Sequence, residues 1–277
     1  MTSIVRETAA EWEPVIEWAG DRPYRHVNPR DLLNGTIPLV VLRGFLNGDA
    51  LDAANAAIDL YRDTAEVRRF PNGTLTTIGP WLLKYLDDPD RYFATARTTE
   101  DVLTSGGAGD PGRAVRRAIQ ELFGLRRVRV PLGPGGQPYA DKVIRIHAPG
   151  VDNPLHNDKV GRDTRELAQL DIRRVTRQLS AVLSVQECNG GVLTIWRKCW
   201  EPADEAFKLR GALGYDSGVV RGCASIDFHP RAGDLYLFCP ECYHAISRVE
   251  PGPERRTIGQ FVGFIDEHRL DEALVWA

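Results

Sequence analysis

The sequence predicts a mainly β protein with helical support, an α+β class in which a β core follows a helical N-terminal region. From residue 126 onward, short apolar or alternating runs are interrupted by glycine and proline, as in a sandwich or barrel. Before that point, apolar residues recur at helical spacing. We therefore expect residues 1–125 to form helical support packed on a β core, residues 126–277, within one structural domain.

The N-terminal region contains one predicted strand and two well-defined predicted helices. Residues 38–45 form a short apolar stretch typical of a buried strand. Residues 49–63 follow Asn47, a good N-cap residue, and carry apolar side chains at helical spacing. Residues 113–123 have one apolar side and are followed by Gly124, which predicts where this amphipathic helix ends.

The C-terminal region contains a series of candidate strands separated by turn residues. They are residues 128–130, 142–146, 179–186, 191–196, 224–228, 234–238 and 256–264. Their number and spacing favour a closed or two-layered β architecture over parallel α/β units.

Composition narrows the classes of partner. A net charge of −3 and a pI of about 6.1 give no basic face for nucleic acid. The longest apolar run, residues 37–42, is far shorter than the roughly 20 residues that span a bilayer. The N-terminus does not resemble a signal peptide, so we expect a cytoplasmic protein acting on a small molecule. The oligomeric state is open, and a homodimer is compatible with the sequence.

The five cysteines do not indicate a disulfide framework, because their number is odd and the chain is long. Cys239 and Cys242 have the C-x-x-C spacing of zinc and redox sites. A structural zinc usually needs a second such pair, which the sequence lacks. We therefore expect buried thiols without a function.

The strongest functional signal is His156-Asn157-Asp158, followed 88 residues later by His244. In an extended chain, His156 and Asp158 project to the same face, so both can reach one metal ion. Two imidazoles and one carboxylate on one side of an octahedral metal leave the opposite positions open, as in non-heme iron oxygenases. The motif alone is weak, because a histidine near an aspartate is common and a lone histidine is more often a satisfied polar residue.

A candidate carboxylate-binding group lies downstream of these residues. Arg255 follows His244 by eleven residues and begins the last predicted long strand, and Thr257 shares its face. An arginine fork and a hydroxyl there could bind the far carboxylate of a 2-oxo diacid. Arg256 replaces Arg255 if the register slips by one residue. A solvated, proline-rich turn is the competing interpretation of this segment.

Together these residues resemble the iron(II)/2-oxoglutarate-dependent oxygenases. The resemblance covers about residues 142–264 and rests on the order and spacing of five elements. These are His156 with Asp158, the strand Gly190 to Trp196, the segment Pro230 to Phe238, His244, and the strand opening at Arg255 to Thr257. The length and the helical first half look similar to bacterial hydroxylases of free or N-succinylated amino acids, to which alkaloid and nucleotide halogenases are related.

The resemblance implies a double-stranded β-helix core, a jelly-roll of the cupin type. It makes His156, Asp158 and His244 the ligands of Fe(II), and it implies that 2-oxoglutarate and O₂ are consumed to give succinate and CO₂. Arg255, helped by Thr257, becomes the partner of the 2-oxoglutarate carboxylate, and Ser184 matches a position that often contacts this co-substrate. Arg145 is a further inward candidate.

Asp158 separates two reactions within this family. In the halogenating relatives, glycine or alanine replaces the carboxylate and opens a site for chloride, so the aspartate favours hydroxylation of an unactivated C–H bond. Desaturation and ring closure stay open, as does the substrate, for which an amino acid derivative or another natural-product intermediate is expected. The alternative is a cupin-like metal-binding or sensing protein without turnover.

Overall fold

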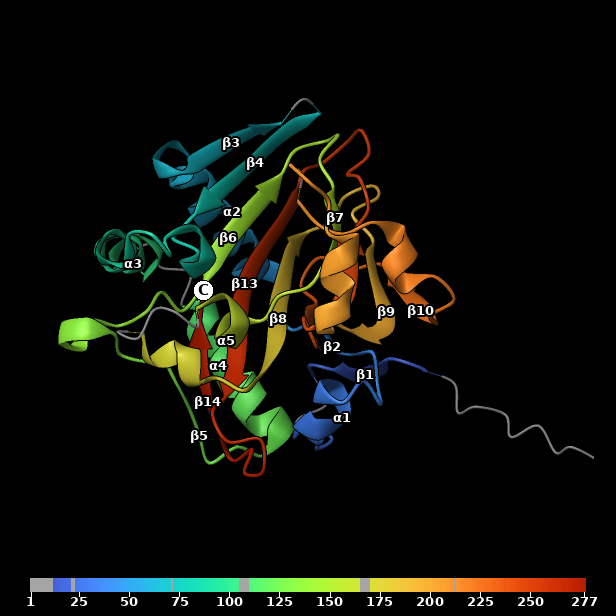
Figure 1. Cartoon of the computed structure of the whole chain (residues 1–277). Helices are drawn as coiled ribbons and strands as arrows, with labels where there is room; N and C mark the ends of the chain where they lie inside the picture. The colour runs from blue at the N-terminus through green and yellow to red at the C-terminus, as the bar shows by residue number, and fades with distance from the viewer. Residues whose placement is uncertain (1–11, 21–22, 71, 105–109, 165–169, 212) are drawn as a thin grey trace, which may run out of the picture.

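The computed structural model describes residues 12–20, 23–70, 72–104, 110–164, 170–211 and 213–277, except for the side chains of residues 98–104 (Figure 1). These residues form two β-sheets and several short helices. The predicted fold class, mostly β with few helices, is therefore confirmed.

The major sheet has ten strands within the described residues, in the order β1-β2-β11-β8-β13-β6-β4-β3, with β14 paired to β13 and β5 to β14. Their bounds are β1 Val15–Trp18, β2 Leu39–Arg43, β3 Glu66–Phe70, β4 Gly73–Ile78, β5 Arg127–Arg129, β6 Val143–His147, β8 Arg177–Gln186, β11 Leu235–Phe238, β13 Arg255–Phe264 and β14 Glu272–Trp276. The described part of the minor sheet has the order β10-β9-β12-β7. Its strands are β7 Asn153–His156, β9 Leu193–Cys199, β10 Ser225–Phe228 and β12 Cys242–Ile246.

The eight strands from β6 to β13 are divided equally between the two sheets. β6, β8, β11 and β13 lie in the major sheet, and β7, β9, β10 and β12 lie in the minor sheet. Leu193, Ile195 and Phe228 of the minor sheet belong to the same hydrophobic cluster as Tyr236 and Phe238 of the major sheet. The two sheets therefore pack together, and except for the adjacent strands β9 and β10, consecutive strands from β6 to β13 lie in different sheets.

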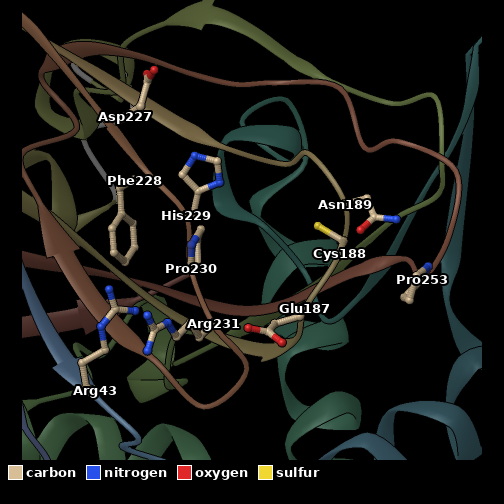
Figure 2. A pocket seen from close by; sticks show the side chains of 10 residues that line it. All are labelled: Arg43, Glu187, Cys188, Asn189, Asp227, Phe228, His229, Pro230, Arg231 and Pro253. Carbon is tan, nitrogen blue, oxygen red and sulfur yellow. The ribbon is translucent and has the colours of Figure 1, made fainter.

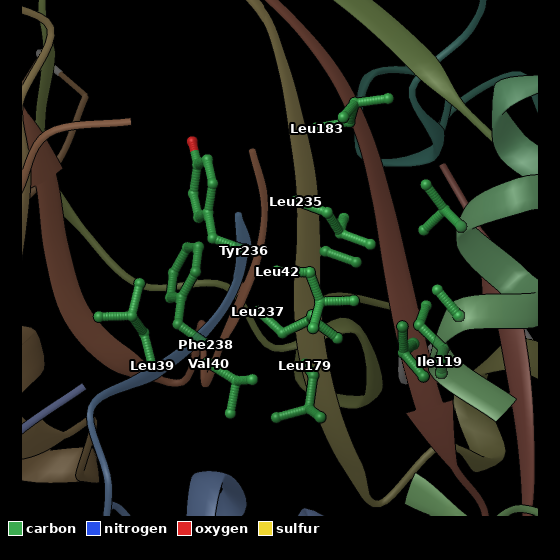
Figure 3. Packing of buried hydrophobic residues seen from close by; sticks show 14 of the residues in the cluster. Leu39, Val40, Leu42, Ile119, Leu179, Leu183, Leu235, Tyr236, Leu237 and Phe238 are labelled. Carbon is green, nitrogen blue, oxygen red and sulfur yellow. The ribbon is translucent and has the colours of Figure 1, made fainter. Parts of the chain in front are cut away.

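The central strands of the major sheet are buried on both faces. Along β11, Tyr236 and Phe238 point to one side, while Leu235 and Leu237 point to the other, toward the helix that carries Ile119 (Figure 3). This alternation follows from the two-residue period of a strand. The face of Tyr236 looks toward the minor sheet and is called the inner face below.

Helices cover the outer face of the major sheet. The α-helices are α1 Pro29–Leu33, α2 Gly48–Leu60, α3 Pro89–Thr104, α4 Pro111–Phe123 and α5 Val160–Asp163. The 3-10 helices are η1 Arg62–Thr64, η2 Leu82–Lys84, η3 Pro134–Gly136, η4 Asp171–Arg174, η5 Pro202–Phe207 and η6 Ser217–Val220. The apolar side of α4 is buried in the main cluster, and Gly124 ends this helix in the left-handed conformation. Asn47 occupies the N-cap position of α2, but its side chain makes no capping hydrogen bond.

The prediction of a mainly helical region before residue 126 needs correction. α2 and α4 were expected, but this region also supplies β1, β2, β3 and β4 to the major sheet, of which only β2 was predicted. β3 is an edge strand whose residues are largely exposed, so its sequence lacks the apolar alternation of a half-buried strand. Residues 1–125 and 126–277 thus share one sheet. No helix in the described ranges combines the length and apolar character needed to cross a bilayer.

Tyr92 ties α3 to the C-terminus of the chain and provides a stability test. Its buried hydroxyl donates to the Ala277 carbonyl at 2.8 Å and accepts from the Ala140 amide at 3.1 Å. The substitution Tyr92→Phe leaves both backbone groups without this partner, which we expect to cost about 1–3 kcal/mol of unfolding free energy. Chemical denaturation measures this loss.

The neighbouring Tyr85 provides the control, because its ring centroid lies 6.2 Å from that of Tyr92 and its hydroxyl has no hydrogen bond with the described residues. Tyr85→Phe should leave the stability nearly unchanged. An equal effect of the two substitutions would contradict the assigned role of the Tyr92 hydroxyl.

Candidate metal and co-substrate site

His156, Asp158 and His244 converge at one end of the minor sheet. β7 and β12 are antiparallel, and their register places His244 directly opposite His156. One potential ligand atom from each of the three residues lies within 4.8 Å of the others. The Oδ2 atom of Asp158 is 4.0 Å from the Nε2 atom of each histidine. The structure therefore brings the three predicted side chains together.

Backbone carbonyls orient both imidazoles. The Nδ1 atom of His156 lies 2.7 Å from the Pro154 carbonyl oxygen, and that of His244 lies 2.9 Å from the Cys242 carbonyl oxygen. A protonated Nδ1 can donate to these carbonyls, which leaves Nε2 of each ring without a proton. This is the tautomer that a metal ligand requires. The Nε2 atom of His156 also lies 3.3 Å from Asn153 Nδ2.

The surroundings of His244 keep its imidazole neutral. Burial, together with the adjacent His156, lowers the pKa of His244 well below its ordinary value of 6.5. The ring of Phe238 packs edge-on against it, with centroids 5.0 Å apart. A neutral imidazole is ready to bind a metal without first losing a proton.

The strand β13 places its first two arginines on opposite faces. Arg255 points to the inner face, where its Nη2 atom donates to the Tyr236 hydroxyl at 3.0 Å. Arg256 points to the outer face, where it forms a 2.9 Å ion pair with Asp59 of α2. Of the two arginines, Arg255 is thus the one that faces the enclosed site.

One row of side chains across three neighbouring strands consists of Thr257, Ser184 and Arg145. Thr257 on β13 is paired with Ser184 on β8 and with Arg145 on β6. Residues paired across strands share a face, so all three lie on the inner face with Arg255. Ser184 and Thr257 are buried, with 3% and 2% of their surface exposed. The structure thus brings these three candidates from the sequence onto one face.

The inner face carries uncompensated positive charge. Neither Arg145 nor Arg255 has a carboxylate within 4.0 Å among the described residues. Burial lowers the pKa of Arg145 below its ordinary value; the charge of Asp158 opposes this shift and the guanidinium of Arg255 adds to it. Because arginine stays charged in proteins, this buried pair favours an anionic ligand.

His147 is a site residue that the sequence did not indicate. It is paired with Arg255 across β6 and β13, and its Nδ1 atom is buried without a hydrogen-bond partner among the described residues. Burial, then the charges of Arg255 and Arg145, lower the pKa of His147 well below its ordinary value. The result is a neutral imidazole beside the two guanidinium groups, with one buried nitrogen that no described residue satisfies. Only the register of β6 reveals it.

Several aromatic and arginine side chains lie in different environments. Tyr92 and Phe93 are fully buried core residues. Trp81 is half-buried, and the guanidinium of Arg145 lies 5.5 Å from its ring centroid. Arg162 donates to Asn157 at 2.8 Å and lies 4.9 Å from the ring centroid of Trp200.

A pocket of about 580 Å³ lies next to the inner face, since its lining residue Phe228 packs against Tyr236 (Figure 2). It is lined by Arg43, Glu187, Cys188, Asn189, Asp227, Phe228, His229, Pro230, Arg231 and Pro253. The three converging residues and Arg255 are not among them. The candidate site is therefore defined by the inner-face side chains and not by this pocket.

Comparison with known proteins agrees with this geometry. A sequence model of the family described as carrier-protein-independent halogenase WelO5 matches residues 25–276. The chain belongs to this family. The resemblance to the iron(II)/2-oxoglutarate-dependent oxygenase superfamily is thereby confirmed.

Two relatives of this WelO5-family chain are informative. The L-gamma-glutamyl-L-propargylglycine hydroxylase of Streptantibioticus cattleyicolor is 29% identical over 250 residues, which cover 86% of this chain and 88% of the relative. The structure of an N-substituted L-amino acid dioxygenase from Burkholderia ambifaria AMMD, in complex with alpha-KG, aligns with a TM-score of 0.57. That match has 20% identity and covers 90% of this chain and 89% of the other, so it supports the fold.

The neutral His147 predicts a dependence of stability on pH. The folded protein keeps His147 neutral, whereas the unfolded chain protonates it below its ordinary pKa of 6.5. The unfolded state then binds more protons, so stability should fall as the pH drops below that value, by up to about 1.4 kcal/mol per pH unit for this group. The substitution His147→Gln should make this fall less steep, as measured by denaturation between neutral pH and about pH 5.

His268 offers a matched control, because its side chain is 88% exposed. His268→Gln should leave the pH dependence of stability as it is in the wild-type protein. If His147→Gln behaves in the same way, His147 is not held neutral by its surroundings.

Proposed function

We propose that this protein is an iron(II)- and 2-oxoglutarate-dependent oxygenase that hydroxylates an unactivated C–H bond of a small molecule. The observation that carries the proposal is the placement of His156, Asp158 and His244 beside an inner-face arginine that lacks a carboxylate partner. A protein that only holds a metal needs the three ligands but not Arg255. For this reason a cupin-like sensor without turnover is the weaker alternative.

His156, Asp158 and His244 fit a ferrous ion. Two imidazole nitrogens and one carboxylate oxygen are the donors of non-heme iron oxygenases, and both imidazoles are already oriented by backbone carbonyls. When bound, iron supplies the activation of O₂ that amino acid side chains cannot supply. The chain's own contribution is to hold the ligands, to keep His244 neutral and to surround the site with buried side chains.

Arg255 fits the distal carboxylate of 2-oxoglutarate. Its planar fork can make two parallel hydrogen bonds to a carboxylate, and its existing contact with the Tyr236 hydroxyl fixes its position. Thr257 and Ser184 add hydroxyl donors from the same face. The complete reaction consumes 2-oxoglutarate, O₂ and substrate and yields succinate, CO₂ and the hydroxylated product.

Asp158 supports hydroxylation over halogenation, although the family is described by a halogenase. Its carboxylate lies 4.0 Å from both histidine Nε2 atoms, so it is placed to occupy the third coordination position. A halide would need that position. The curated hydroxylase relative is consistent with the same outcome.

The substrate that we propose is an amino acid derivative with an acidic group. Arg145 is a second guanidinium that no carboxylate of the described ranges contacts, and its pKa responds to the charge of Asp158, so it lies near the proposed metal site. A carboxylate of the substrate would neutralise it. The two relatives described above are named for a dipeptide-like and an N-substituted amino acid, which belong to this chemical class.

The strand order supports a double-stranded β-helix as the framework of this activity. Counting β6 as the first of eight consecutive strands, the major sheet contains strands one, eight, three and six, and the minor sheet contains two, seven, four and five. This alternation brings the end of β7 beside the start of β12. It accounts for the meeting of His156 with His244.

The first functional prediction concerns Asp158. With iron(II), 2-oxoglutarate and a panel of N-acylated amino acids and γ-glutamyl dipeptides, the wild-type protein should release succinate and hydroxylate at least one compound. It should form no chlorinated product in the presence of chloride. Asp158→Ala should lower succinate release by at least about a hundredfold, because one metal ligand is lost. Succinate quantification and product mass spectrometry provide the readouts, and a chlorinated wild-type product would contradict the assignment.

The second functional prediction distinguishes Arg255 from Arg256. Arg255→Ala should raise the KM for 2-oxoglutarate by roughly tenfold to a hundredfold, because a buried charge-assisted contact is worth about 1.5–3 kcal/mol. Arg256→Ala removes an outer-face ion pair with Asp59, so it should lower stability while leaving that KM within about twofold. If Arg256→Ala raises the KM and Arg255→Ala does not, the assignment of the inner arginine is wrong.

A further inference from the structure

Three cysteines meet beside the candidate iron site. Cys239 and Cys242 flank the turn between β11 and β12, and Cys199 at the end of β9 is paired with Cys242 across the minor sheet. Their sulfur atoms all lie within 4.8 Å of one another. Cys239 and Cys242 are buried, with 3% and 4% exposure, whereas Cys199 is the accessible member. The sequence showed only the C-x-x-C pair, because the third thiol comes from a separate strand.

The arrangement matches what a thiophilic metal ion requires. Zinc bonds to thiolate sulfur at about 2.3 Å in tetrahedral geometry, which places the sulfur atoms roughly 3.8 Å apart. Three sulfur atoms within 4.8 Å can reach this spacing through small rotations about χ1. No fourth His, Cys, Asp or Glu ligand atom completes this group among the described residues, so the fourth position is open to water.

The charges around the thiols suit a bound cation with three thiolates. Glu241, between the two turn cysteines, accepts a 3.0 Å hydrogen bond from Lys159 and lies 4.0 Å from the Nε atom of Arg177. Zinc with three thiolates carries one negative charge, and Glu241 adds another. Lys159 and Arg177 balance these two charges, so the whole group is neutral. This charge balance lowers the free-energy cost of keeping a thiolate site partly buried.

The same turn holds two of the proposed iron ligands. The Cys242 carbonyl oxygen lies 2.9 Å from His244 Nδ1, and the Pro240 carbonyl accepts the amide of Asp158 at 2.8 Å. A metal ion bound to Cys239 and Cys242 would fix this turn and anchor it to β9 through Cys199. The thiol cluster is thus placed to support the geometry of His244 and Asp158 from outside.

We propose that Cys199, Cys239 and Cys242 form a second metal site, which binds one zinc ion through three thiolates. The site is distinct from the His156, Asp158 and His244 group and uses softer donors, which prefer zinc over ferrous iron. It does not depend on oxygenase activity. Its role is to stabilise the turn that positions the two neighbouring iron ligands.

Zinc content and zinc coordination test the proposal on the full-length chain. Protein loaded with Zn²⁺ alone and then dialysed should retain one zinc per chain, even in a His156→Ala variant that weakens the other site. X-ray absorption at the zinc edge should show three sulfur neighbours at about 2.3 Å. In the same His156→Ala background, the double substitution Cys199→Ser with Cys242→Ser should reduce retained zinc by at least about tenfold, whereas Cys223→Ser should retain it.

Several outcomes would overturn the second site. Zinc coordinated only by nitrogen and oxygen in the His156→Ala variant would do so, as would full zinc retention by a folded double serine variant. A disulfide joining two of the three cysteines in the non-reduced protein, detected by peptide mass spectrometry, would exclude the three-thiolate site. Because the absorption measurement uses chains with all five cysteines intact, it decides the question even where the serine variants fail to fold.

Discussion

The pairing of β7 with β12 is the constraint on which the candidate site depends. His156 and His244 are separated by 88 residues, and only the antiparallel register of these two strands places them opposite each other. A shift of one residue would turn His244 to the other face of its strand. Asp158 then completes the group because it lies two residues beyond His156. Backbone carbonyls at Pro154 and Cys242 fix the two rings, so the ligand geometry is set largely by the backbone.

The alternation along β13 is a second consequence of the same architecture. It gives Arg255 and Arg256 different environments although they are adjacent in sequence. Arg256 forms an ion pair with Asp59 on the outer face, while Arg255 and Arg145 on the inner face have no carboxylate partner in the described part of the chain. The protein thus encloses positive charge in a site where burial keeps His147 and His244 neutral. An anionic co-substrate and an acidic substrate would balance that positive charge when bound.

Much of the C-terminal half and the metal group could be predicted from the sequence. β6, β8, β9, β10, β11 and β13 follow apolar runs between turns, whereas β7, β12 and β14 were not among the predicted strands. The order of His156, Asp158, His244 and Arg255 is specific as a set. The β3–β4 hairpin was missed because β3 is an exposed edge strand without apolar alternation. His147, Tyr236 and Cys199 were missed because each joins its cluster through strand register, which local sequence does not encode. Strand register also decides whether Arg255 or Arg256 faces the site, so the sequence alone could not distinguish them.

An anaerobic titration of the purified protein with iron(II) and 2-oxoglutarate tests the central claim most directly. If His156, Asp158 and His244 hold the iron and Arg255 holds the co-substrate, a weak visible charge-transfer band should appear only when both are present. It should saturate at one iron per chain and be absent when His156 or His244 is replaced by alanine. A wild-type protein that gives no such band, and binds neither iron nor 2-oxoglutarate, would contradict the account.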